Sequence, residues 1–87
     1  MEIKKAKSFV FDMLDICSEM EEESFAETCS GIYNDVKAAK SLEAVINCAR
    51  ELMVFVNEQP WDEMELTEFK YDIENLFNQL LEESEEF

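Results

Sequence analysis

The chain has 87 residues, which is enough for one compact domain and too few for two. Its 22 acidic and 7 basic residues give a formal net charge of −15, which argues against direct binding to nucleic acid or anionic membranes. With one glycine, one proline and a hydrophobic fraction of 47%, the composition predicts a folded domain of helices joined by short links.

The first helix is predicted at about residues 3–20, because apolar side chains recur there at steps of three and four. The stripe comprises Ile3, Ala6, Val10, Met13, Cys17 and Met20. At 100° per residue, Phe11 projects well away from this stripe, among Lys4, Lys7 and Asp15. We therefore expect Phe11 to lie off the core face.

The second helix is predicted at about residues 24–39, where the same periodicity continues. Its stripe comprises Phe25, Cys29, Ile32, Val36 and Ala39. Ser24 is the predicted N-cap, and Glu27 three residues later completes a capping box. Gly31 interrupts the helix at a cost of about 1 kcal/mol relative to alanine, which predicts a kink or a close helix–helix approach.

The third helix is predicted at about residues 42–58, with Ser41 as its N-cap and Pro60 preventing its continuation. A broad stripe comprises Leu42, Val45, Ile46, Ala49, Leu52, Met53 and Val56. Val54 and Phe55 point away from that stripe, so the helix is apolar nearly all round. This pattern is typical of a central helix packed on several sides, or of a helix whose Val54 and Phe55 form a homodimer seam.

The fourth helix is predicted at about residues 62–82, and an acidic tail over about 83–87 is expected to fray. Its stripe comprises Leu66, Phe69, Ile73, Leu76, Phe77, Leu80 and Leu81. The start is left open between Pro60 and a position near Thr67. The sequence thus predicts an all-α fold, a single domain over residues 1–87 built as an antiparallel bundle of four amphipathic helices.

The chain lacks the residues of the common catalytic motifs, so no enzymatic activity, cofactor or metal site is predicted. It has no histidine, which removes the Ser-His and Cys-His catalytic groups and the histidine-containing zinc and di-iron motifs. The pairs Glu19/Glu22 and Glu65/Glu68 have the E-x-x-E spacing of magnesium-dependent nucleotide hydrolases, but no E-x-x-D occurs. Such a hydrolase is a remote alternative.

Cysteine usage indicates a reducing compartment. Cys17, Cys29 and Cys48 are odd in number, form no C-x-x-C and fall on or beside apolar helical stripes. We expect three buried free thiols in a cytoplasmic protein. No stretch resembles a secretory signal or reaches the length of a transmembrane segment.

The candidate partner-binding residues lie in two acidic regions, one around the first helix junction and the other along the last helix. Trp61 is either an aromatic anchor within a ring of carboxylates or a plug for the end of the bundle. Met64 and Tyr71 share a polar face with Glu68 if the helix is continuous from Pro60. The predicted set comprises Trp61, Asp62, Met64, Glu65, Glu68, Tyr71 and Asp72, with Glu19, Glu22 and Glu23 in the first region.

Helical carboxylates three or four residues apart stand about 5–6 Å apart at Cβ, close to the phosphate spacing of a nucleic-acid strand. The chain accordingly resembles several small acidic helical classes: nucleic-acid-mimic phage inhibitors, immunity proteins against basic nuclease toxins, and secretion chaperones or adaptors. The D-x-x-Y-Y-P stretch of colicin-type immunity proteins is absent. The leading hypothesis is a non-enzymatic protein that occludes a basic, nucleic-acid-handling partner. The alternative is an adaptor or chaperone-like bundle that forms a homodimer.

Overall fold

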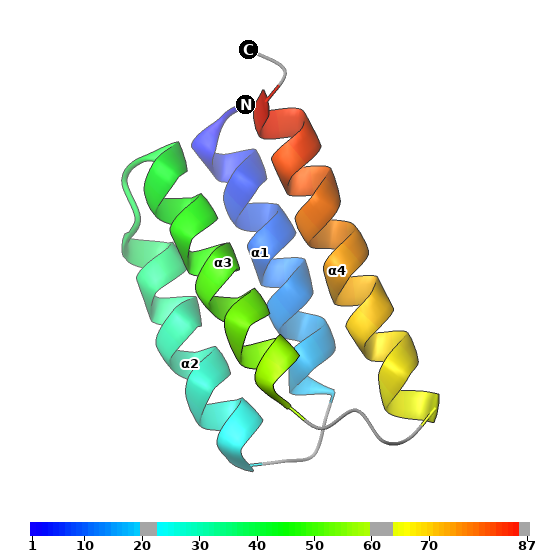
Figure 1. Ribbon diagram of the computed structural model, residues 1–87. Coiled ribbons are helices and arrows are strands. Elements are labelled where there is room, and N and C mark those ends of the chain that lie inside the picture. Colours follow the sequence, from blue (N-terminus) through cyan, green and yellow to red (C-terminus); the bar gives the residue numbers. More distant parts are fainter. Residues whose placement is uncertain (20–22, 60–63, 86–87) are drawn as a thin grey trace.

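The computed structural model describes residues 1–19, 23–59 and 64–85, with the side chains of 23–25, 64–66 and 85 left out (Figure 1). These residues form four helices, which confirms the predicted all-α bundle. The helices are α1 (Ile3–Ser18), α2 (Glu23–Ala38), α3 (Leu42–Glu58) and α4 (Met64–Glu85).

Successive helices run in opposite directions, so both chain termini lie at one end of the bundle (Figure 1). Helices α1 and α3 each contact all three other helices, whereas α2 and α4 do not meet within the described residues. The bundle is therefore flattened, with principal extents of 38 × 23 × 17 Å. The prediction that α3 is central is confirmed, and α1 is central as well.

The helix boundaries agree with the prediction for α3 and differ by a few residues elsewhere. Ser41 caps α3 as expected, since its Oγ accepts a hydrogen bond from the Ala44 amide at 3.1 Å. Helix α1 ends at Ser18, short of residue 20. Helix α2 begins at Glu23, so Ser24 lies inside it and the predicted N-cap position is wrong.

Helix α4 begins at Met64, between the two starts that the sequence left open. It continues to Glu85, beyond the predicted end at residue 82. Two contacts hold this last turn: Lys5 Nζ lies 2.9 Å from Glu83 Oε1, and Ser84 Oγ donates to the Leu81 carbonyl at 2.9 Å. The fraying of residues 83–87 concerns motion and stays a prediction, and residues 86–87 lie outside the described residues.

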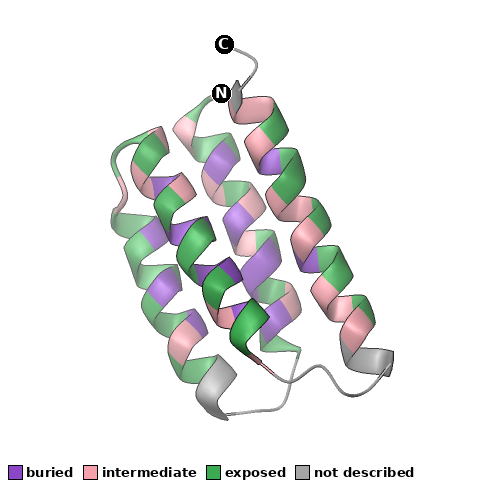
Figure 2. Ribbon diagram, viewed as in Figure 1, coloured by how far each residue is buried: buried purple, intermediate pink, exposed green. Residues whose placement is uncertain are grey.

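The core is built from the predicted stripes of all four helices (Figure 2). Its largest fully buried side chains are Met13, Leu52, Ile73, Leu80, Val10, Val36, Val45, Val56 and Cys17. No polar or charged residue in the described part of the chain is buried. Hydrophobic burial, worth about 25 cal/mol per Å² of apolar surface, is thus the main favourable term in folding.

Phe11 corrects the view of α1 as a helix with one apolar face. Phe11 is half-buried, and its ring centroid lies 5.1 Å from that of Tyr33 on α2, at an interplanar angle of 49°. Such tilted aromatic pairs contribute about 0.5–1.5 kcal/mol beyond the area they bury. Helix α1 packs against three helices, so residues beyond its single apolar stripe, such as Phe11, are also partly covered.

Gly31 does not mark a close helix approach, which corrects the second expectation for α2. A Cβ built at this position meets nothing within 4 Å, and its backbone φ is not positive. We expect Gly31→Ala to stabilise the protein by about 0.5–1 kcal/mol through helix propensity, raising Tm by several degrees. Thermal unfolding followed by circular dichroism measures this, and a lowered Tm would show that the glycine is required.

Candidate interaction surface

Carboxylates from all four helices lie toward one end of the bundle, although Asp35, Glu43, Glu82 and Glu83 lie toward the other. The second halves of α1 and α3 and the first halves of α2 and α4 share the end opposite the chain termini, which we call the acidic end (Figure 1). The acidic residues of this end whose side chains are described are Asp12, Asp15, Glu19, Glu27, Glu51, Glu58, Glu68, Asp72 and Glu74. Lys70 is the one basic residue among the described residues of this end.

Five of the seven basic residues lie toward the opposite end, beside the chain termini. They are Lys4, Lys5 and Lys7 on α1, Lys37 near the end of α2 and Lys40 just after it, while Arg50 lies at the middle of α3. Lys5 pairs with Glu83, and Lys7 Nζ donates to the Lys37 carbonyl at 3.1 Å. The first acidic region and the first half of α4 thus share one end of the structure, whereas Glu82 and Glu83 of α4 lie at the other end, with the lysines.

This concentration of like charge opposes folding, and salt should relieve it. The chain has a net charge of −15, and among the described residues there is one ion pair, Lys5–Glu83. Most of the described carboxylates therefore have no cationic partner to reduce their mutual repulsion. Because ions screen exposed charges over about 8–10 Å at physiological salt, we expect Tm to rise as sodium chloride goes from low to moderate concentration. Thermal scans over a salt series measure this, with a neutral osmolyte as control. An unchanged Tm would contradict the expected self-repulsion.

The structure brings part of the predicted partner surface together on α4. Glu68 and Asp72 are both exposed and one helical turn apart, and Tyr71 beside them is 61% exposed. In the first acidic region Glu19 is exposed. The other predicted residues cannot be placed: Trp61, Asp62 and Glu22 lie outside the described residues, as do the side chains of Met64, Glu65 and Glu23.

The predicted dimer seam divides between surface and core. Val54 is 58% exposed, whereas Phe55 is half-buried and packs against the core cluster. Because α3 contacts three helices, even the side of this helix that carries Phe55 is partly covered. Val54 is the member of the pair that faces solvent.

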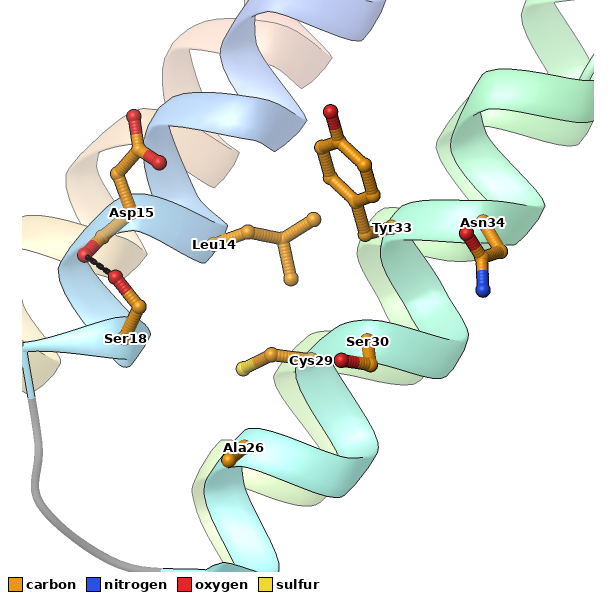
Figure 3. A pocket seen from close by; sticks show the side chains of 8 residues that line it. All are labelled: Leu14, Asp15, Ser18, Ala26, Cys29, Ser30, Tyr33 and Asn34. Atoms are coloured by element: carbon orange, nitrogen blue, oxygen red, sulfur yellow. Dashed lines mark hydrogen bonds between the residues drawn. The ribbon is translucent and has the colours of Figure 1, made fainter.

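A groove between α1 and α2 was not foreseen from the sequence. It has a volume of about 340 Å³, and Leu14, Cys29 and Tyr33 point into the space between the two helices (Figure 3). Small side chains at Ala26 and Ser30 of α2 leave this space open. Cys29 and Ser30 lie three and four residues after Ala26, so these three small side chains share one face of α2.

The rim of the groove is polar on both sides. Asp15 and Ser18 border it from α1, and Ser30 and Asn34 border it from α2 (Figure 3). Ser18 Oγ donates to the Asp15 carbonyl at 2.7 Å, which closes the last turn of α1. Among the described residues, Asp15 is the one Asp, Glu, Lys or Arg that lines the groove.

Tyr33 forms one end of the groove and is 44% exposed. Phe11 contacts its ring, and Lys37 Nζ lies 5.2 Å from its centroid. The ring is therefore held in place between α1 and α2, and its π-face already attracts a cation.

All three cysteines are buried free thiols, as predicted. The Cys17 thiol, fully buried behind the groove, interacts with the sulfur of Cys29. This hydrogen bond, together with burial, raises the pKa of Cys17, and the same bond lowers the pKa of Cys29. Burial, with Asp35 and Glu51 nearby, raises the pKa of Cys48. Cys17 and Cys48 are thus protonated at neutral pH and behave as small apolar side chains.

Two further features of the described residues bear on function. No group of three or more cysteines and carboxylates is arranged to hold a metal ion within the described ranges. Across the same residues, no helix has the length and apolar character needed to cross a bilayer.

No family model matches the chain, and no characterised protein or solved structure is significantly similar to it.

Proposed function

We propose that this protein is a non-enzymatic acidic binding protein that occludes a basic, nucleic-acid-handling protein. One observation carries the proposal: carboxylates from all four helices converge at the acidic end, while the lysines of α1 and α2 lie at the other end. Solubility alone needs a net charge of magnitude about 2–8 in a small domain, well below the −15 of this chain.

A charge distribution of this kind favours encounter with a cationic surface. Separated charges orient the molecule as it approaches, and attraction raises association rates by roughly 10- to 1,000-fold. On α4 the exposed carboxylates of Glu68 and Asp72 repeat with the period of one turn, about 5–6 Å at Cβ. This spacing suits a groove that normally receives phosphates, as in inhibitors of the nucleic-acid-mimic, phage anti-defence or immunity type.

A structural or adaptor bundle is the second candidate, favoured by exposed apolar side chains. Val54 and Tyr71 are 58% and 61% exposed, and either could contribute to a homodimer or adaptor contact. In that case the acidity serves solubility, the mass depends on protein concentration, and partner binding is insensitive to salt.

Affinity capture at low and high salt distinguishes the two candidates. With the full chain as bait in a lysate of its source cell, we expect a basic nucleic-acid-binding protein to be retained at low salt and released at high salt. Retention of a neutral or acidic protein that survives high salt would favour the adaptor. Retention of no protein at low salt would count against both.

A further inference from the structure

We propose that the groove between α1 and α2 receives a single lysine or arginine side chain of the basic partner. The inference rests on the proposed function and names the point at which the partner is anchored. It differs from the sequence-based surface, which places the contact on α4 and around the two helix junctions.

The size of the groove suits one long side chain. Its volume of about 340 Å³ lies at the lower limit of ligand pockets, which span roughly 300–1,000 Å³. The groove is bounded by two packed helices, and its residues Leu14 and Cys29 belong to the core, so its floor is fixed before a partner arrives. A preformed site avoids the entropy cost of ordering a loop on binding.

The chemistry of the lining suits a side chain with an apolar stem and a cationic tip. Leu14, Ala26 and the Tyr33 ring offer apolar contact to the methylene groups, which lysine and arginine bury readily. At the rim, Ser18 and Ser30 carry hydroxyls that can accept from N–H donors, and the exposed Asp15 carboxylate, which points along α1 in Figure 3, is an acceptor beside the groove.

Charge complementarity selects a cation over other guests. Asp15 lines the groove, and exposed Glu19 and Glu27 follow on α1 and α2 at the acidic end. An anionic guest would be repelled by these groups. A neutral guest such as leucine would fill the apolar floor but gain no attraction from the Asp15 carboxylate. Lys37 interacts with the Tyr33 ring and is not a lining residue.

Titration with an acetylated, amidated hexa-arginine peptide at low salt tests the inference. We expect Asp15→Asn to raise Kd about fivefold or more, because it removes a charge-assisted hydrogen bond. Ala26→Leu, which fills the groove without changing charge, should weaken binding to a similar extent. In NMR spectra of the unmodified chain, the amides of residues 14–18 and 26–34 should shift most.

Asp35→Asn is the matched control for Asp15→Asn. It removes one exposed carboxylate from α2, near Cys48 of α3 and outside the groove lining. We expect it to change Kd by less than about twofold, as screened surface charges do. Circular dichroism should show that each variant keeps its helical content, so that a change in Kd reports on the site.

Three outcomes would overturn the inference. Equal weakening by Asp15→Asn and Asp35→Asn, with no effect of Ala26→Leu, would leave the proposed function standing without the groove. Equal affinity for a neutral hexapeptide with leucine at its centre would reject the cationic occupant. No binding of hexa-arginine to the unmodified chain at low salt would contradict the proposed function as well.

Discussion

Replacing Leu52 with alanine is expected to lower the free energy of unfolding by about 2–5 kcal/mol. Leu52 is fully buried on α3, and α3 contacts all three other helices, so the surrounding side chains have little freedom to collapse into the space. For a domain of this size such a loss is a large share of a total stability of about 5–15 kcal/mol. Urea unfolding followed by circular dichroism measures the change.

Val54→Ala provides the matched control on the same helix. Val54 lies two residues further on and is 58% exposed, so its truncation should change stability by no more than about 0.5 kcal/mol. Similar losses for Leu52→Ala and Val54→Ala would contradict the packing described for α3. Sedimentation of Val54→Ala gives a second result, because a lower mass than that of the unmodified chain would support the homodimer seam.

Charge reversal on α4 is expected to have a large effect on the affinity for the basic partner. Converting Glu65, Glu68 and Asp72 to lysine is expected to weaken binding of the basic partner roughly 10- to 100-fold, or about 1.4–2.8 kcal/mol. Each change removes one attraction and adds one repulsion, and the Glu68 and Asp72 side chains are exposed, so lysine fits there without disturbing the core. Isothermal titration calorimetry with the captured partner measures the effect.

A control triple variant separates local contact from net charge. Asp35, Glu43 and Glu82 are exposed and lie in the halves of their helices nearer the chain termini. Their conversion to lysine changes net charge by the same amount, yet should weaken binding only a few fold. If both triple variants lose affinity equally, the acidic end is not the contact surface.

Much of the fold could be predicted because the periodicity of apolar residues is a local property. The spacing of apolar residues at three and four predicted the helix boundaries to within a few residues. Ser41 was correctly predicted as the N-cap of α3. Helix packing is not local. The half-buried state of Phe11 depends on Tyr33 of α2, and the sequence does not show that Gly31 faces open space on the exposed side of α2.

The candidate site was predicted in part. Glu68 and Asp72 of α4 are exposed as expected because polar side chains opposite an apolar stripe face solvent. These residues lie at the same end of the bundle as Asp12 and Asp15 of α1 because the two helices are antiparallel. The positions of the charges along the sequence do not show this proximity. The groove depends on how α1 and α2 pack against each other. The small side chains of Ala26 and Ser30 therefore indicate a groove only when it is known that these two helices are neighbours.

Competition with nucleic acid tests the proposed function most directly. The basic protein captured at low salt is loaded with fluorescent duplex DNA or single-stranded RNA, and the acidic protein is added while anisotropy is followed. We expect near-stoichiometric release of the nucleic acid, and markedly less release by the Glu65, Glu68 and Asp72 charge-reversal variant. A stable ternary complex that keeps its nucleic acid bound would contradict occlusion.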